Sequence, residues 1–494
     1  MPSRSRLPGL RPRLVRVLMA LGSLLIGSAA AQGLPIEVEA ALRKARLPTS
    51  ALSAVVQEAG SGERLLAWNE HESVNPASVF KLFTTYAALD QFGPAWSWST
   101  PVYLSGALRD GVLDGSVVIQ GRGDPKLVVE RIWLLLRRLQ QMGVHEIRGD
   151  ILLDRSAFAL RDRSPGEFDN EPFKPQNVQP DALLLNYKSV TYSFSPDAAR
   201  GVATVAVEPA LAGVQVDASV PLSPGACDDW RAALKPLLTD PSRVRFGGAY
   251  PASCGERSWP LAHADPRAYN ARLVEQLWRE LGGRLGGTVR DGPVPAGARL
   301  AFELPSPALA EVVRDINKYS NNVMAEQLFL SLAMPAPTAA PPAASGTASA
   351  PAGVRLEDGR EALRRWLGSR FGDEAVREAV IDNGSGLSRD VRVSANLLAR
   401  VLQRAWGSAV MPELISSLPV SGTDGTLKRS TATAGRAHLK TGSLRDVAAV
   451  AGYVLSGSGK RYVVVVVVNH PLAGSARPAI DALVQWAILD GPAR

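Results

Sequence analysis

Three short groups of residues in this chain could together perform acyl transfer. They are Ser78 and Lys81, three positions apart, then Ser320 and Asn322, and finally the run Lys440-Thr441-Gly442-Ser443. A serine hydroxyl is a weak nucleophile and needs an adjacent base. At positions i and i+3 of a helix, Ser78 and Lys81 project from the same face. Lys81 is therefore the predicted base.

A lysine can act as a base near neutral pH only if its pKa falls. The ordinary pKa of about 10.4 must move toward about 7–8. Burial together with a second cation can produce that shift, and Lys440 is the expected second cation. The alternative is a surface serine beside a solvated lysine. Apolar residues cover nearly every face of the segment 80–89, so we expect it to be buried, and buried polar groups need partners.

The other two groups are uninformative when each is taken alone. Ser320-Asn321-Asn322 lies between predicted helices at 309–318 and 323–332, where a serine commonly caps a helix or turn. In the acyl-transfer interpretation, Ser320 relays a proton and Asn322 holds the substrate backbone.

The lysine of the third group lies on a predicted edge strand. An extended peptide can pair with such an edge, and Lys440 and Thr441 would then hold the peptide's carboxylate. Gly442 lets the substrate approach the backbone closely. The N–H groups of Ser78 and Ser443 are the expected oxyanion hole, with Ser443 lining the same site.

Both ends of the chain contribute predicted strands. Strand-like runs occur at 52–57, 65–68, 437–441, 447–455 and 462–469, and final helical periodicity covers 477–489. Asn75-Pro76 is a helix start signal and Gly93 a stop signal. The run 463–468 is apolar on both faces, which indicates a sheet covered on both sides. We expect an α+β (α/β) fold with one antiparallel sheet flanked by helices.

The long middle of the chain predicts an insertion. Ser78 and Ser320 are 242 positions apart, more than one helical lobe requires. We assign 32–97 and 301–494 to the catalytic domain, and 98–300 to a large, mostly β insertion of two subdomains. Residues 334–353 are rich in Pro, Ala and Ser, which is typical of a flexible surface loop.

The first 31 residues have the pattern of a secretory signal peptide. Five arginines precede a short apolar run at 17–26, and Ala29-Ala30-Ala31 offers a cleavage site. A membrane anchor is the alternative, but ten apolar residues are too few to span a bilayer. Of 55 basic and 47 acidic residues, the remaining chain keeps an excess of only three basic residues. The mature chain is thus predicted to have no transmembrane segment and no nucleic-acid partner.

Cys227 and Cys254 are the only cysteines. In an oxidising compartment we expect them to form a disulfide, although two free buried thiols are the alternative. Closing this loop would contribute about 3–4 kcal/mol to stability. The sequence contains neither a zinc-type cysteine spacing nor an H-E-x-x-H motif. We therefore expect no metal and no cofactor.

With these residues in view, the chain resembles the class C low-molecular-mass penicillin-binding proteins of the D-alanyl-D-alanine carboxypeptidase/endopeptidase type, peptidase family S13. The resemblance rests on the three motifs, read here as Ser-Val-Phe-Lys, Ser-Asn-Asn and Lys-Thr-Gly-Ser, and on the long insertion. Further stretches that resemble the family are 121–125, 382–389 and 421–426.

The resemblance implies a serine transpeptidase/β-lactamase-like domain in the periplasm. It also implies cleavage of D-Ala–D-Ala bonds and crosslinks in peptidoglycan stem peptides through an acyl-enzyme, with β-lactams as inhibitors. By motif match, Asp154 and Arg389 would recognise the substrate's diaminopimelate side chain. Two residues depart from the family pattern, Asn383 before Gly-Ser-Gly and the bulky Arg445 after Lys-Thr-Gly-Ser-Leu. Both could change substrate preference.

Two rival functions remain at this level. A serine β-lactamase would carry similar motifs, but the insertion and Ser-Asn-Asn argue against it. A catalytically silent scaffold that binds peptidoglycan is the other rival. Loss of activity would be expected to damage at least one motif residue, and here all are intact.

Overall fold

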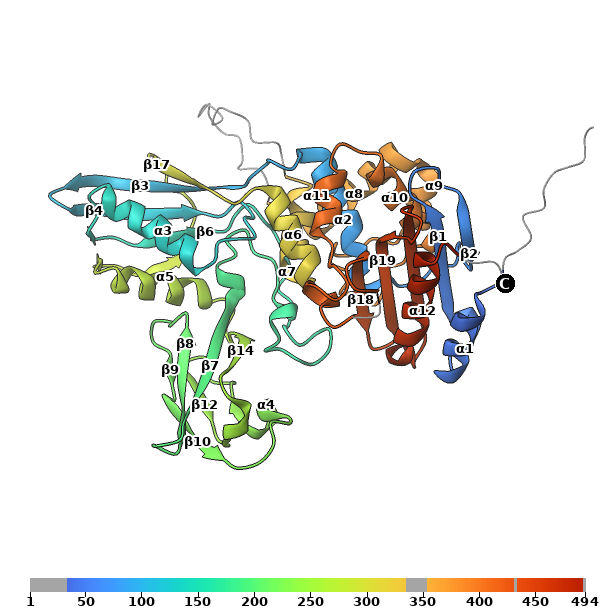
Figure 1. The fold of residues 1–494 in the computed structure, drawn as a ribbon. Helices are drawn as coiled ribbons and strands as arrows, with labels where there is room; N and C mark the ends of the chain where they lie inside the picture. Colours follow the sequence, from blue (N-terminus) through green and yellow to red (C-terminus); the bar gives the residue numbers. More distant parts are fainter. Residues whose placement is uncertain (1–32, 335–352, 431–432, 492–494) are drawn as a thin grey trace, which may run out of the picture.

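The computed structural model describes residues 33–334, 353–430 and 433–491. The predicted signal segment 1–31 lies outside the described residues, as does nearly all of the predicted loop 334–353. Figure 1 shows one body built from both ends of the chain and an insertion that extends away from it.

A five-stranded sheet forms the centre of the first body. Its order is β18 (Ala437–Leu444), β19 (Val447–Leu455), β20 (Arg461–Asn469), β1 (Leu52–Glu58) and β2 (Arg64–Trp68). All neighbouring pairs are antiparallel. The first strand pairs with the last, from Leu52 opposite Val468 to Glu58 opposite Tyr462. The predicted antiparallel sheet shared by both chain ends is confirmed.

Helices cover both faces of this sheet (Figure 1). On one face lie α1 (Ile36–Lys44) and α12 (Arg477–Ile488). On the other lie α2 (Lys81–Phe92), α6 (Leu309–Tyr319), α7 (Asn322–Ser331), α8 (Leu356–Phe371), α9 (Asp373–Glu378), α10 (Ala395–Trp406) and α11 (Met411–Ser417). Val463, Val465 and Val467 of β20 join the second core, and their neighbours 464, 466 and 468 join the first. The apolar run thus serves two cores because strand side chains alternate between faces.

The segment that carries Ser78 differs from the predicted continuous helix. A 3₁₀ turn (Ala77–Phe80) precedes α2, and Gly93 ends α2 as predicted, with a φ of 77°. Asn75 is not the N-cap of α2, which begins after Phe80; its Oδ1 instead accepts from the N–H of Ala77 at 2.8 Å and so stabilises the turn before the helix. Ala77 has a φ of 48°, which costs an L-residue about 1–2 kcal/mol. Backbone segments of the same protein that pack against this tight turn hold it in place.

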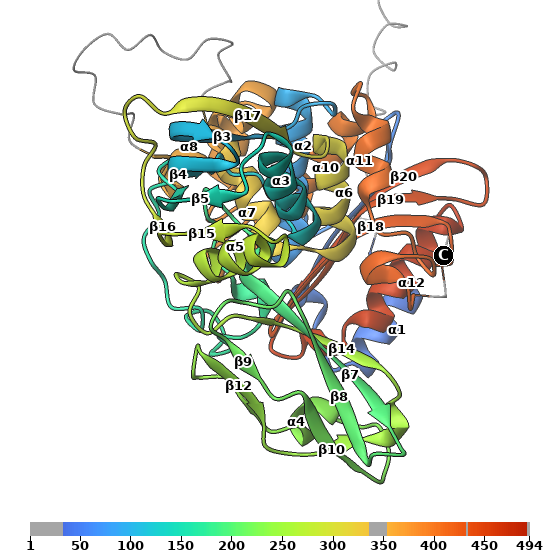
Figure 2. The ribbon, with the colours of Figure 1, turned by 90° about the vertical axis from the view of Figure 1, so that its left-hand side faces the viewer.

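The insertion contains three further sheets, of seven, five and three strands (Figure 2). The first comprises β3 (Ser99–Arg109), β4 (Val112–Gln120), β5 (Glu146–Ile147), β6 (Ile151–Asp154), β15 (Arg284–Leu285), β16 (Val289–Asp291) and β17 (Arg299–Pro305), with α3 (Val129–Gln141) and α5 (Tyr269–Glu280) against it. β17 pairs with β3, so this sheet continues past the predicted boundary at 300. Otherwise the division into domains stays a prediction.

The second part of the insertion is built from short strands. They are β7 (Ser189–Asp197), β8 (Val202–Glu208), β9 (Gln215–Val216), β10 (Ser219–Ser223), β11 (Pro236–Leu237), β12 (Arg243–Phe246), β13 (Tyr250–Pro251) and β14 (Arg257–Ala262), with the short helix α4 (Trp230–Ala233). A disulfide joins Cys227 to Cys254 in this part. One continuous apolar core runs through both parts of the insertion, so they pack on each other.

A segment at 155–188 returns from the insertion to the first body. The backbone N–H of Asp181 donates to Gln327 Oε1 and its carbonyl accepts from Gln327 Nε2, both at 2.9 Å. Gln327 lies on α7 and is completely buried. The insertion is thereby fixed to the helix that starts at Asn322. Within the described residues, no helix has the length and apolar character needed to cross a bilayer.

Replacing Gly386 by alanine should destabilise the protein. Gly386 has a φ of 76°, and a Cβ there would lie 2.0 Å from the carbonyl oxygen of Ala77. The left-handed backbone alone costs about 1–2 kcal/mol, and the collision must also displace the turn that carries Ser78. Thermal unfolding followed by circular dichroism should show a lower Tm. Gly474→Ala is the matched control because a Cβ at Gly474 meets nothing within 4 Å; equal Tm values would contradict the packing argument.

Candidate active site

The first two candidate residues meet at the start of α2. Lys81 Nζ donates to Ser78 Oγ at 2.9 Å. The same Nζ donates to Asn322 Oδ1 at 2.7 Å and to the carbonyl oxygen of Ser385 at 2.6 Å. Lys81 is completely buried, and an ammonium group has three donors. All three are satisfied, so burial leaves none of them unpaired.

The second motif occupies the junction of two helices. Ser320 follows α6 with a φ of 57°, a left-handed conformation. Asn321 caps α7, its Oδ1 accepting from the N–H of Met324 at 3.1 Å. Asn322 is the first residue of α7, and its Nδ2 donates to the carbonyl of Gln176 at 3.2 Å. The reversal at Ser320 therefore places both polar side chains of the motif on the site.

The third motif lies on β18, an edge strand of the five-stranded sheet, as predicted. Lys440 is completely buried, and its Nζ donates to Ser320 Oγ at 2.9 Å. Thr441 Oγ1 donates to Thr426 Oγ1 at 2.7 Å. A Cβ on Gly442 would lie 2.5 Å from the carbonyl of Pro76 and 3.2 Å from the nitrogen of Ser78. Only glycine lets this strand pass so close to the serine.

Two lysines are thus buried in one small region. Burial lowers the pKa of Lys440 to about 7. Burial, and then the charge of Lys440, hold the pKa of Lys81 well below its ordinary value, while Glu326 acts in the opposite direction. Desolvation penalises the charged form of each ammonium, and two like charges penalise it further. A neutral lysine beside Ser78 is what base catalysis requires.

A cavity of about 820 Å³ opens over these residues. This volume falls within the range typical of small-molecule sites. The first body lines it with Ser78, Ser320, Asn322, Thr441, Gly442 and Ser443, among others. The insertion lines it with Pro175, Gln176, Tyr187, Ser189, Thr191 and Pro260. The structure therefore brings the predicted motif residues to one cleft, and the insertion forms part of its wall.

Of the two residues expected to read a substrate side chain, only Arg389 lies beside the cleft. It lines a smaller hollow together with Phe168, Ser443 and Arg445. Its guanidinium lies 4.8 Å from the centroid of the Phe168 ring, and its Nη1 lies 3.5 Å from Asp446 Oδ1. Asn383, one of the departures from the family pattern, accepts from the N–H of Ser385 at 3.0 Å. Asn383 therefore stabilises the loop whose Ser385 carbonyl accepts a hydrogen bond from Lys81.

Asp154 is elsewhere. It ends β6 in the insertion and is only 2% exposed. Its carboxylate accepts from Gln120 Nε2 at 3.1 Å and from the N–H of Ser156 at 2.9 Å. These contacts follow from the pairing of β6 with β4. The structure thus places Asp154 inside the insertion rather than in the cleft, and the two residues are not brought together.

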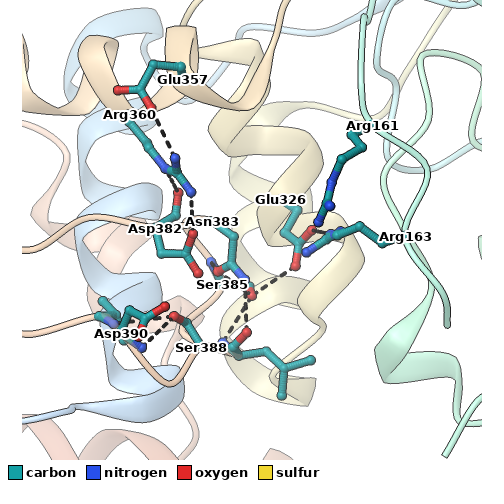
Figure 3. Close-up of polar contacts among 12 residues, drawn as sticks. Arg161, Arg163, Glu326, Glu357, Arg360, Asp382, Asn383, Ser385, Ser388 and Asp390 are labelled. Carbon is teal, nitrogen blue, oxygen red and sulfur yellow. Dashed lines mark hydrogen bonds and ion pairs between the residues drawn. The ribbon is translucent and has the colours of Figure 1, made fainter. Parts of the chain in front are cut away.

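Sequence reasoning missed two contributors to the site. One is the backbone carbonyl of Ser385, which accepts from Lys81. The other is Glu326, a buried acid one turn beyond Asn322 on α7. Figure 3 shows Glu326 between Ser385 and Arg163. A single charged residue in a helix with no other charge, four positions after a motif residue, was the available signal. No group of His, Cys, Asp and Glu suited to a metal ion occurs among the described residues.

Comparison with known proteins gives a consistent result. The family model described as "D-Ala-D-Ala carboxypeptidase 3 (S13) family" matches residues 34–488. D-alanyl-D-alanine carboxypeptidase DacB of Haemophilus influenzae is 26% identical over 80% of each chain. The D-alanyl-D-alanine carboxypeptidase of Actinomadura sp. is 28% identical over 90% of this chain and 82% of its own.

Solved structures show the same fold. The crystal structure of penicillin binding protein 4 from Haemophilus influenzae superimposes with a TM-score of 0.69 and 22% identity, covering 91% of this chain and all of that one. A second structure of that protein, complexed with a β-lactam, gives a TM-score of 0.66 with the same coverage. The predicted fold class is confirmed. Since the family model spans nearly all of the described chain, this protein belongs to the D-Ala-D-Ala carboxypeptidase 3 (S13) family.

Proposed function

We propose that this protein is a penicillin-sensitive serine D-alanyl-D-alanine carboxypeptidase that also acts as a DD-endopeptidase on peptidoglycan crosslinks. The observation that carries the proposal is the 2.9 Å hydrogen bond from completely buried Lys81 to Ser78. A nucleophile in contact with a base of lowered pKa is the arrangement that acyl transfer needs. The names of the two curated relatives support the same substrate class.

In the proposed reaction, neutral Lys81 accepts the proton of Ser78 as Ser78 Oγ attacks the carbonyl of the penultimate D-Ala. The N–H groups of Ser78 and Ser443 stabilise the oxyanion. Ser320 relays a proton to the leaving amine, and its 2.9 Å contact with Lys440 supports that role. Water then hydrolyses the acyl-enzyme and regenerates Ser78.

The remaining cleft residues bind the substrate in this proposal. Asn322 holds the acyl carbonyl, and Lys440 and Thr441 hold the terminal carboxylate. Arg389 would contact the carboxylate of a diaminopimelate side chain, because its hollow adjoins Ser443. Asp154 is left out, since its carboxylate is occupied inside the insertion. The predicted secretory signal supports a periplasmic location, where peptidoglycan is accessible.

Replacing Ser78 by alanine should abolish covalent modification by benzylpenicillin. The wild-type mature protein should gain one long-lived adduct that maps to Ser78. The acyl group from benzylpenicillin stays bound as an ester because it hinders its own hydrolysis. Intact-mass spectrometry over time measures both proteins. Rapid turnover of benzylpenicillin without a lasting adduct would indicate a β-lactamase. An adduct of equal yield in Ser78→Ala would refute the assignment, and no reaction in the wild type would leave the scaffold alternative.

The pH dependence of peptide hydrolysis should reveal the charge on Lys440. Its pKa of about 7 in the free protein means that the ammonium loses its proton as the pH rises through that value. Attraction for a terminal carboxylate is therefore present below about pH 7 and lost above it. We expect kcat/KM for a peptide ending in D-Ala–D-Ala to fall on the alkaline side. The same peptide with an amidated C-terminus is the control, and parallel alkaline limbs would contradict this role.

A further inference from the structure

A buried carboxylate near Lys81 has no place in the reaction described above. Glu326 lies on α7 four positions after Asn322 and is only 4% exposed. An ionised carboxylate is costly to bury unless it is paired and hydrogen-bonded. Figure 3 shows its side chain directed toward Ser385 on one side and Arg163 on the other. It is therefore held by two different parts of the chain.

The first contact connects Glu326 to the nucleophile's base. Ser385 Oγ donates to Glu326 Oε1 at 3.1 Å, and the carbonyl oxygen of the same residue accepts from Lys81 Nζ at 2.6 Å. Ser385 is completely buried. Ser385 thus contacts both the carboxylate of Glu326 and the ammonium group of Lys81. Both groups lie in an interior where electrostatic interactions are strong.

The second contact comes from the insertion. Arg163 Nη2 donates to Glu326 Oε2 at 3.2 Å. The Arg163 side chain is 33% exposed, so it reaches from the surface of the returning segment to the buried acid. The insertion thereby places one positive charge against a buried carboxylate of the first body.

Few other charges face Lys81 from the elements packed around it. β18 presents Lys440, α7 presents Glu326, and the returning segment presents Arg163. The loop after α9 approaches with the neutral Ser385, and its Asp382 is paired with Arg360 at 2.5 Å. Among the described residues, the pair of Glu326 and Arg163 is therefore a place at which the insertion can alter the charge around the base.

We propose that Glu326 and Arg163 are positioning residues that together set the protonation of Lys81, with Arg163 of the insertion masking the negative charge of Glu326. Unmasked, the carboxylate would keep Lys81 protonated to higher pH, so that a smaller fraction of Lys81 would be neutral and able to accept the proton of Ser78. When Glu326 is paired with Arg163, it still holds the Ser385 side chain in place. The carbonyl of Ser385 therefore keeps its position as an acceptor for Lys81 Nζ. The inference rests on the proposed acyl-transfer function, in which Lys81 must be neutral to act.

The charges around Lys81 and Glu326 are consistent with this arrangement. The interaction with Glu326 raises the pKa of Lys81, against the larger lowering by burial and Lys440. Burial raises the pKa of Glu326, while Arg163, Ser385 and Lys81 each lower it. Each contact that stabilises the ionised carboxylate is one of those described above.

The test is the pH profile of the second-order rate constant for acylation by benzylpenicillin. Its acidic limb reports loss of the proton from Lys81. Glu326→Gln removes the negative charge, so the inflection of this limb should move to lower pH. Arg163→Gln exposes the charge, so the inflection should move to higher pH. A charge at this range shifts such a group by on the order of one pH unit. In the double variant, loss of Arg163 should add no further shift.

Two control variants separate charge from structure. Arg163→Lys keeps the charge and should leave the inflection at the wild-type pH. Arg267→Gln removes an arginine that is 76% exposed and pairs with Asp162, and it should shift nothing. If thermal unfolding shows that Glu326→Gln does not fold, the comparison of Arg163→Gln with Arg163→Lys serves as the test.

Several outcomes would overturn the inference. Lower rates with an unmoved inflection would mean that the pair is only structural. Shifts of the two single variants in the same direction, or a shift in Arg163→Lys as large as in Arg163→Gln, would contradict masking. Failure of the proposed function would look different, because the wild-type protein would then show no acylation at any pH.

Discussion

The site depends on the burial of two lysine side chains side by side. Lys81 and Lys440 are both completely buried, which is rare because an ammonium group loses its hydration there. Lys81 compensates with three acceptors, and Lys440 with the hydroxyl of Ser320 and the carbonyl of Thr441. The same desolvation that makes this arrangement costly lowers the pKa of both groups. The destabilising feature is thus also the one that makes a lysine usable as a base.

The backbone segments around the two lysines and Ser78 are also closely packed. Gly442 of β18 and Gly386 of the loop after α9 both press on the 3₁₀ turn that carries Ser78. Neither position leaves room for a Cβ, and the turn itself has a left-handed residue at Ala77. Three segments distant in sequence therefore fix one serine. We regard the strained turn as the consequence of this convergence, since local sequence favoured an ordinary helix.

Local signals explain what could be predicted from the sequence. The i, i+3 spacing of Ser78 and Lys81 and the apolar run in β20 act over a few residues, so the contact and the doubly covered sheet were foreseeable. The family resemblance supplied the meeting of the three motifs in one cleft. It also assigned Asp154 to the substrate site, whereas the structure holds this residue inside the insertion through the pairing of β6 with β4.

Contacts made by backbone atoms or across long separations were not predictable. Any residue has a carbonyl, so nothing in the sequence singled out Ser385 as an acceptor for Lys81. Glu326 binds one partner 59 positions away and another 163 positions away. The insertion also meets Asn322 through the carbonyl of Gln176. That carbonyl can only accept and the ammonium of Lys81 can only donate. Together they fix the amide of Asn322 in one orientation, with its oxygen toward the base. The insertion therefore helps to orient a residue of the candidate site, and it also lines the cleft.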